Sequence, residues 1–346
     1  MLSVAIIGYG KMGQIRASAL EASGRATISG VYDEQMSDDC PYHRYPSAES
    51  AYQDPDVHAV FVCTPNYWIA PLCAAALDSG KHVFAEKPPA FNSNQLEQVR
   101  EVEATTGKVL MYGFNHRHHG SVQRMKSIID SGKMGRCLWM RGRYGKEVDE
   151  SFFDGWRADK RLAGGGIMLD QGIHMLDLLV YLGGGFDEVQ AMVSNLFWKI
   201  DGIEDNVFAQ FRSSETGVCA SLHSTMTQWR YLFSLEIFLE KGALILNGLK
   251  TSSGAYGDEE LTIKHNVRNR EQGHFEAEER IIYTKNTSWA SEVDMFIHSV
   301  NERTTPPLGN SNDASAVMKL MDEIYAAETR SDVESSGASR HAASQG

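Results

Sequence analysis

The 346-residue sequence has few cysteines, and no two of them form a C-x-x-C pair. The five present are Cys40, Cys63, Cys73, Cys137 and Cys219. An odd, scattered set argues against a disulfide framework or a cysteine zinc site, and it favours reduced thiols in a cytoplasm. The sequence also lacks an apolar run of the ~20 residues that a membrane-spanning helix requires. No basic segment precedes the apolar start of the chain, so we expect no signal peptide.

Basic residues are outnumbered by acidic ones. Lys and Arg total 33 against 45 Asp and Glu, which gives a formal net charge of −12. This balance argues against nucleic acid as a partner, because phosphate backbones require a basic surface. The hydrophobic fraction of 42% and the chain length predict a folded protein of two domains.

The first part of the chain alternates short apolar segments with amphipathic ones. The strand candidates are 3–8, 26–32, 58–63, 82–85 and 109–113. Helix candidates lie between them, so the pattern predicts βαβ units and a parallel sheet over residues 1–120.

The pattern changes after residue 120. From residue 188 onward several strand candidates follow one another without helices between them, which predicts an antiparallel sheet in an α+β domain over 121–330. The polar, Ser/Ala/Gly-rich end over 331–346 predicts a disordered tail.

A glycine-rich segment joins the first expected strand to the first helix, and it reads Gly8-Tyr9-Gly10-Lys11-Met12-Gly13. In a dinucleotide-binding turn, Gly8 would allow the tight turn, Gly10 the approach of the pyrophosphate, and Gly13 close helix packing. Asp33 follows 20 residues later, where a carboxylate can accept hydrogen bonds from the adenosine ribose. It would repel a 2′-phosphate, so we expect NAD rather than NADP. The alternative is an ordinary glycine turn with a surface Asp.

Two further polar segments follow strand candidates at the same expected edge of the sheet. Thr64-Pro65-Asn66 follows the third strand and Glu86-Lys87-Pro88-Pro89 follows the fourth. Ligands of open α/β sheets bind at this edge. Lys87 beside a nicotinamide could hold a substrate hydroxyl or relay its proton. Ordinary turns and a solvated lysine are the alternatives.

An apolar helix candidate over 164–182 carries two reactive groups. Asp170 and His174 are four residues apart and would share one helix face. An imidazole can accept a hydroxyl proton near neutral pH, and a carboxylate nearby can orient it. The alternatives are a core histidine, half of a metal site, or an Asp177 that only orients the backbone. Gly172 between them predicts close approach by another group.

A local histidine cluster comprises His116, His118 and His119. No cysteine accompanies it, and neighbouring histidines often only solvate a loop. We expect no metal site here.

Together these motifs resemble those of the Gfo/Idh/MocA family, named after glucose–fructose oxidoreductase and inositol dehydrogenase. The matching features are 8–13, Asp33, 64–66, 86–88, Asn115 with Arg117, and 164–177. The resemblance implies an α/β protein with an N-terminal Rossmann dinucleotide-binding domain. It also implies a C-terminal α+β domain with a large open, mainly antiparallel sheet, through which many relatives form dimers or tetramers.

The resemblance also implies an NAD(P)-dependent dehydrogenase that transfers hydride between a secondary alcohol of a sugar or cyclic polyol and the nicotinamide. Lys87 would be the catalytic lysine, Asp170 and His174 would line the substrate site, and His174 would be the general base. Asn115, Arg117 and Arg157 would contact substrate. Cofactor contacts would come from 8–13, Asp33, 64–66, Glu86 and Lys87.

Two positions depart from the family pattern. Ile69 stands where relatives often have a histidine, and Pro89 where they usually have an aliphatic residue. Other functions stay open: a non-catalytic sensor of NAD and a sugar, or a reductase of a tetrapyrrole or an aromatic diol. A sensor would have no need for Lys87, Asp170 and His174 together.

Overall fold

The computed structural model describes residues 1–36, 39–266 and 278–342, with side chains of the last helix up to Ala327. The chain divides into two compact units. Unit 1 consists of Met1–Gln123, Asp154–Gly164 and Lys285–Met318, and unit 2 of Arg124–Phe153, Gly165–Thr284 and Lys319–Gly346. The sequence predicts continuous domains over 1–120 and 121–330. The structure differs, because two later stretches fold with the N-terminal part.

Unit 1 contains a five-stranded parallel sheet in the order β2-β1-β3-β4-β5. The strands are β1 (Leu2–Ile7), β2 (Ala26–Tyr32), β3 (Ala59–Val62), β4 (His82–Ala85) and β5 (Leu110–Tyr112). The helices are α1 (Lys11–Ser23), α2 (Ala48–Gln53), α3 (Asn66–Asp78), α4 (Ser93–Thr106), η1 (Asn115–His118), η3 (Trp156–Ala158), α6 (Lys160–Ala163) and α8 (Ser288–Glu302). The predicted parallel Rossmann sheet is confirmed.

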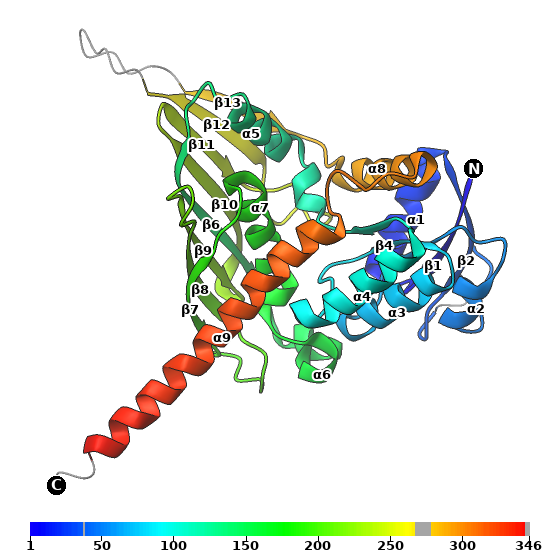
Figure 1. The fold of residues 1–346 in the computed structure, drawn as a ribbon, viewed down its shortest axis with the longest axis horizontal. Coiled ribbons are helices and arrows are strands. Elements are labelled where there is room, and N and C mark those ends of the chain that lie inside the picture. Colours follow the sequence, from blue (N-terminus) through cyan, green and yellow to red (C-terminus); the bar gives the residue numbers. More distant parts are fainter. Residues whose placement is uncertain (37–38, 267–277, 343–346) are drawn as a thin grey trace. The chain divides into compact units, whose positions relative to one another are not determined.

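Helix α8 explains why residues 285–318 belong to unit 1. Its apolar side chains complete the core on the face of the sheet that α1 covers, and Figure 1 shows the two helices side by side. The ring centroid of Phe296 lies 5.3 Å from that of Phe61 and 5.8 Å from that of Phe84. Without α8 these buried rings would face water, so the parallel sheet depends on a segment more than 200 residues away in sequence.

Unit 2 contains an eight-stranded sheet in the order β13-β12-β11-β10-β6-β9-β8-β7. The strands are β6 (Cys137–Glu147), β7 (Glu188–Ser194), β8 (Asn206–Arg212), β9 (Cys219–Thr225), β10 (Thr227–Leu239), β11 (Gly242–Asn247), β12 (Glu259–His265) and β13 (Glu279–Tyr283). Neighbours are antiparallel except β6 and β9, which are parallel. The predicted mainly antiparallel sheet is confirmed.

One face of this sheet is covered and the other is bare. The covering helices include α5 (Gly120–Asp130) and α7 (Ile173–Gly183), which lie on one side in Figure 1. The short helices η2 (Glu150–Phe153) and η4 (Met168–Gly172) complete unit 2. Strand β8 alternates buried and exposed residues, as expected of a sheet with one solvated face. Over the described residues no helix covers the second face.

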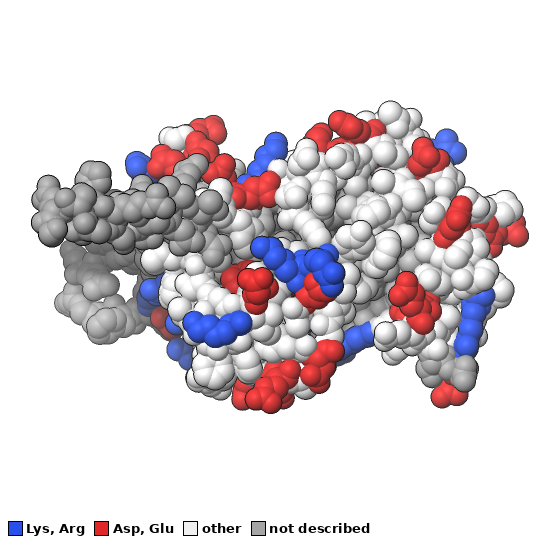
Figure 2. Space-filling model, turned by 90° about the horizontal axis from the view of Figure 1, so that it is seen from below, with Lys and Arg blue, Asp and Glu red and all other residues white. Residues whose placement is uncertain are grey.

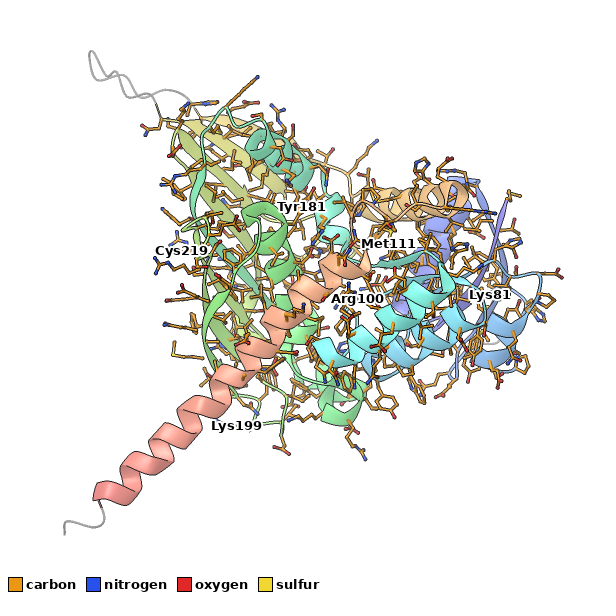
Figure 3. The ribbon with its side chains drawn as sticks, viewed as in Figure 1. Lys81, Arg100, Met111, Tyr181, Lys199 and Cys219 are labelled. Atoms are coloured by element: carbon orange, nitrogen blue, oxygen red, sulfur yellow. The ribbon has the colours of Figure 1, made fainter. Side chains whose placement is uncertain are left out.

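Helix α9 (Ser311–Ala342) begins in unit 1 and continues in unit 2. At its start Arg100 of α4, which is labelled in Figure 3, donates a 2.6 Å hydrogen bond to Asn312. The sequence predicts a disordered tail over 331–346, but the helical backbone continues to Ala342. Residues 331–342 hold no proline and only one glycine to interrupt backbone hydrogen bonding. Residues 343–346 lie outside the described residues. No helix in the described part of the chain is long and apolar enough to cross a membrane.

Candidate active site

Two glycines of the turn after β1 have no room for a side chain. Gly8 has a φ of 91°, and a Cβ there would lie 2.5 Å from the carbonyl oxygen of Cys63. A Cβ at Gly13 would lie 2.1 Å from the carbonyl oxygen of Gly8. Packing of the turn therefore requires both glycines, whether or not a ligand binds.

Gly10 differs, because a Cβ there would meet no atom within 4 Å. The residue is the N-cap of α1 and supplies no capping side chain to the first turn. Protein packing gives no reason for this glycine. A pyrophosphate on the amides at the start of α1 does, since a side chain would occupy its place. The turn thus fits a dinucleotide, and Tyr9, Lys11 and Met12 supply the intervening backbone.

Asp33 stands at the end of β2 and holds the same turn. Its Oδ2 accepts a 2.6 Å hydrogen bond from the backbone N–H of Tyr9, and Oδ1 accepts a 2.8 Å bond from that of Gln35. A carboxylate has about four acceptor positions, so two stay available to ribose hydroxyls. Asp33 is half-buried and lies beside the turn, as the NAD prediction requires.

In the segment after β3, one buried polar side chain has a protein partner and another has none. Asn66 is buried, and its Nδ2 donates a 2.8 Å hydrogen bond to the carbonyl of Ala163, which ties α3 to α6. Thr64 Oγ1 is buried and has no hydrogen-bond partner among the described residues. Pro65 is the N-cap of α3. A buried hydroxyl of this kind fits a site that a ligand completes.

Lys87 lies in the segment that follows β4. It is half-buried, and Glu86, Pro88 and Pro89 on either side of it are buried. The Lys87–Pro88 peptide bond is cis. Ile69, which replaces the family's histidine, is fully buried in α3. Its side chain is part of the hydrophobic core.

Glu86 is held by a buried arginine that the sequence analysis missed. Arg16 of α1 places Nε 2.7 Å from Glu86 Oε1 and Nη1 2.7 Å from Glu292 Oε2 of α8. Its guanidinium lies 4.5 Å from the ring centroid of Phe84. Burial disfavours the cation, but the two carboxylates outweigh it and raise the pKa of Arg16 above its ordinary value. The buried stripe Gly13, Arg16, Ala17 and Leu20 was the available signal.

Two of the predicted substrate contacts have protein partners in unit 1. Asn115 Nδ2 donates a 3.2 Å hydrogen bond to a serine hydroxyl at the start of α8. Arg117 is 2% exposed, and its Nη1 lies 2.8 Å from Asp313 Oδ2. Arg157 in η3 is half-buried, with its guanidinium 4.3 Å from the ring centroid of Trp156. Asn115 and Arg117 therefore connect η1 to α8 and α9, while Arg157 keeps a partly accessible cation.

The three clustered histidines are buried rather than solvated. Burial, followed by the charges of Arg16 and Arg117, lowers the pKa of His118 to about 3. Nowhere in the described ranges do three or more His, Cys, Asp or Glu side chains form a group that could hold a metal ion.

His118 predicts a loss of stability in acid. Its pKa lies near 6.5 when unfolded and about 3 when folded, so the unfolded chain binds the proton first as pH falls. The stabilising effect is complete above pH ~6.5, and up to about 1.4 kcal/mol is lost per pH unit below it. Urea unfolding from pH 7 to 4 should show a shallower decline for His118→Gln than for the wild type. The exposed His265→Gln serves as control, and an equal decline in all three would contradict the assignment.

In unit 2, Asp170 and His174 do not share a regular α-helix. Asp170 lies in the π-turn η4, and His174 lies in the first turn of α7. The expected regular helix is thus interrupted by a π-turn between the two residues, and their shared face stays a prediction. A Cβ at Gly172 would lie 2.5 Å from Sδ of Met168 and 3.2 Å from Cβ of Ser224 on β9. The close approach expected at Gly172 is thus made by Met168 and by the sheet, and π-turns of this kind recur at functional sites.

Asp170 has a buried cationic partner that the sequence analysis missed. Lys146 at the end of β6 is 7% exposed, and its Nζ forms an ion pair with Asp170 Oδ2. The same Nζ lies 3.8 Å from the ring centroid of Phe152. His174 is 6% exposed and Asp177 fully buried. No local sequence signal marks a lysine at a strand end as the partner of a carboxylate 24 residues later.

Glu204 fixes the start of the turn that carries Asp170. Its carboxylate accepts backbone hydrogen bonds from Gly166 (2.6 Å) and Met168 (2.9 Å), and one from the hydroxyl of Tyr325 (2.9 Å). Burial raises its pKa, against the lowering effect of these bonds. A Cβ at Gly166 would lie 2.0 Å from the carbonyl oxygen of Glu204, which explains the glycine at this position.

Comparison with known proteins places both parts of the chain. A family model described as an oxidoreductase family with an NAD-binding Rossmann fold matches residues 2–114. A second, described as the GFO/IDH/MocA C-terminal domain, matches residues 122–245. A solved structure of levoglucosan dehydrogenase in complex with NADH and levoglucosan superposes with a TM-score of 0.82 at 21% identity. It covers 95% of this chain and 97% of that one, and it shows the shared fold.

Curated relatives are similar over part of their length. Levoglucosan dehydrogenase of Pseudarthrobacter phenanthrenivorans is 30% identical over 210 residues, which cover 56% of this chain and 54% of that protein. D-glucoside 3-dehydrogenase of Escherichia coli is 31% identical over 210 residues, 58% of each protein. The chain thus spans little more than half the length of these relatives. With family models matching both its Rossmann part and its C-terminal sheet, the chain belongs to the Gfo/Idh/MocA oxidoreductase family.

Proposed function

We propose that the protein is an NAD-dependent dehydrogenase that interconverts a secondary alcohol and a ketone on a sugar or cyclic polyol. The observation that carries the proposal is the turn after β1, where Gly10 has no packing role and Asp33 keeps free acceptor positions. The levoglucosan and glucoside dehydrogenases among its relatives support a sugar substrate.

Oxidation of the alcohol removes a hydride from its carbon and a proton from its hydroxyl group, and each goes to a different acceptor. Bound NAD supplies the hydride acceptor. His174 takes the hydroxyl proton as general base, and Lys87 holds the hydroxyl oxygen and stabilises the negative charge that develops on it. Asp170, which pairs with Lys146, accepts a hydrogen bond from a neighbouring hydroxyl of the substrate. Arg157 is proposed as a further substrate contact.

A substrate screen tests this function. The purified chain is incubated with NAD and a panel of myo-inositol, levoglucosan, monosaccharides, methyl glycosides and disaccharides, and NADH absorbance is followed. We expect NAD reduction with at least one member, and a rate lower by about 10²-fold or more with Lys87→Met under the same conditions. NAD binding without turnover of any member would favour a sensor instead.

Cofactor preference should depend on Asp33. Its carboxylate accepts from the ribose diol and repels a 2′-phosphate, so kcat/KM should be higher with NAD than with NADP. Asp33→Ser should lower the ratio of kcat/KM with NAD to kcat/KM with NADP by about tenfold, mainly through a lower KM for NADP. This is the effect expected from removing one charge repulsion near the site. The neighbouring exposed acid gives the control Glu34→Ser, which should leave the ratio unchanged. A wild type that prefers NADP would overturn the assignment.

The base assigned to His174 predicts a pH profile for alcohol oxidation. The rate requires the neutral imidazole, so kcat/KM should fall as the pH is lowered and the imidazole becomes protonated. His174→Asn should abolish this acidic limb, and a chelator should have no effect. Inhibition by chelator that zinc or manganese reverses would make Asp170 and His174 metal ligands instead.

We also propose that the chain forms a homodimer or homotetramer through the bare face of the eight-stranded sheet. Apolar side chains gather there: Trp139 and Phe238 stack with ring centroids 4.0 Å apart, and Met192 is 67% exposed. A patch of this kind commonly marks a protein interface. Light scattering should give a mass above the 38.4 kDa of one chain.

The cellular setting is proposed from chemistry alone. All five cysteines are free thiols, which supports a reducing cytoplasm.

On the face drawn in Figure 2, the described Lys and Arg side chains are interspersed with Asp and Glu and form no continuous basic stripe. This supports the proposal that nucleic acid is not a partner.

A further inference from the structure

We infer that unit 2 carries a carbohydrate subsite made of aromatic side chains, which binds the second pyranose ring of a disaccharide substrate. The aromatic platform consists of Phe153, Phe197, Trp198 and Trp229. The inference rests on the proposed function, because it assumes that the ring that reacts binds at Asp170.

The platform is contiguous with Asp170 through a series of contacts within unit 2. Asp170 pairs with Lys146, whose Nζ lies 3.8 Å from the ring centroid of Phe152. The ring centroids of Phe152 and Phe153 lie 5.1 Å apart, and those of Phe153 and Trp198 lie 5.0 Å apart. A polar pair therefore stands at one end of the series and aromatic rings at the other.

The outer end of the platform is accessible. Phe197 is 56% exposed and Trp229 is 52% exposed, although both side chains are large and apolar. Their ring centroids lie 4.9 Å apart at an interplanar angle of 80°. Trp198 links them to Phe153, with centroids 5.1 Å from Phe197 and 6.3 Å from Trp229. These rings carry no ionised group, so the surface suits the apolar face of a neutral sugar ring rather than an anion.

Three backbone hydrogen bonds hold the loop of the platform in place. Between β7 and β8 the amides of Leu196, Phe197 and Trp198 donate to the buried carboxylate of Asp205, at 2.8, 2.7 and 3.0 Å. Indole Nε1 of Trp198 donates a 3.3 Å hydrogen bond to the carbonyl of Met226. Lys199, labelled in Figure 3, follows these residues in the same loop. Preorganised aromatic groups lose little entropy on binding, which favours a ligand site over an adventitious apolar patch.

Asp205 adjoins Glu204, and this adjacency couples the loop to the reacting centre. Glu204 fixes the π-turn of Asp170 through the amides of Gly166 and Met168, while Asp205 fixes the aromatic loop. Two consecutive carboxylates thus set the position of the platform relative to Asp170. A substrate that spans both groups would meet a rigid surface.

An irregularity in strand β10 sets the orientation of Trp229. The pairing of β10 with β6 shifts register between Thr227 and Leu232. Trp229 lies within this shift with a φ of 57°, in the left-handed region that bulky side chains rarely adopt. Such irregularities redirect side chains and are frequent beside active sites. Here the distortion brings the exposed indole against Phe197.

The test compares two substrate classes in three proteins. Wild type, Trp229→Ala and Trp139→Ala are assayed with NAD and either monosaccharides (D-glucose, D-galactose) or disaccharides (cellobiose, maltose). We expect Trp229→Ala to raise KM for the disaccharides by about tenfold and to leave KM for the monosaccharides within twofold. Trp139 is also exposed but lies on the bare sheet face, so Trp139→Ala should leave the disaccharide-to-monosaccharide ratio unchanged.

Direct binding separates this inference from the proposed function. Titration with cellobiose or maltose should saturably change tryptophan fluorescence in the wild type and in Trp139→Ala but not in Trp229→Ala, even without turnover. No NAD reduction with any sugar, but intact disaccharide binding, would reject the proposed function and keep the subsite. Unchanged disaccharide KM and binding in Trp229→Ala, or a change only in its oligomeric mass by light scattering, would overturn the subsite and make the platform a protein interface.

Discussion

Replacing Lys87 by methionine should lower kcat for alcohol oxidation by about 10²-fold or more, the usual scale for a positioned proton-transfer group. The dissociation constant for NAD should change little, because the glycine turn and Asp33 provide the cofactor contacts. Methionine keeps the length and apolar stem of the lysine, so the half-buried position between Glu86 and Pro88 should tolerate it. Stopped-flow NADH formation and calorimetric NAD titration measure the two quantities separately.

Lys81, labelled in Figure 3 just before β4, provides the matched control. Its Nζ donates hydrogen bonds to the carbonyl oxygens of Asp54 and Val57, at 2.6 and 2.7 Å. Lys81→Met should therefore reduce thermal stability without reducing kcat of the folded protein. Near-normal turnover in Lys87→Met would assign Lys87 a structural role and raise the sensor alternative.

Replacing Arg16 by methionine should destabilise the protein by about 3–5 kcal/mol, the cost of leaving buried carboxylates without their cation. Arg16 is the shared partner of Glu86 and Glu292, both within 2.7 Å, and it is fully buried. Its loss should also loosen α8 from the parallel sheet. Urea unfolding followed by circular dichroism measures the free energy of unfolding directly.

Arg25, which lies between α1 and β2, offers a control that also pairs with α8. Its Nη1 lies 3.4 Å from Asp294 Oδ1 of α8, but both side chains are largely exposed, at 43% and 54%. Arg25→Met should cost no more than about 1 kcal/mol, as exposed ion pairs do. Equal losses in the free energy of unfolding for the two variants would show that burial does not strengthen the ion pairs of Arg16 with Glu86 and Glu292.

The parallel sheet and the glycine turn beside Asp33 could be predicted because their signals are local. Short apolar runs, the glycine turn and Asp33 each stand within a few residues of the strand that positions them. The structure confirms the two sheets and places Asp33 against the glycine turn through the amide of Tyr9. The roles of Lys87, Asp170 and His174 stay predictions that the variants must test.

The rest depends on partners distant in sequence. Glu292 and Arg16 are 276 positions apart in sequence, and no local feature of either residue predicts that they pair. The same holds for Lys146 and Asp170, which meet only because β6 ends beside the π-turn. Buried ion pairs of this kind are set by tertiary packing, so periodicity and motifs do not reveal them. The assignment of 154–164 and 285–318 to unit 1 was missed for the same reason.

Transfer of deuterium from substrate to nicotinamide tests the central claim most directly. The best substrate of the screen, deuterated at the carbinol carbon that becomes the ketone, is incubated with NAD and the enzyme, and the NADH formed is analysed by mass spectrometry. Direct hydride transfer predicts one deuterium per NADH molecule, with its formation slowed by Lys87→Met in proportion to kcat. NADH that carries no deuterium, or ketone formed without NADH, would contradict the account.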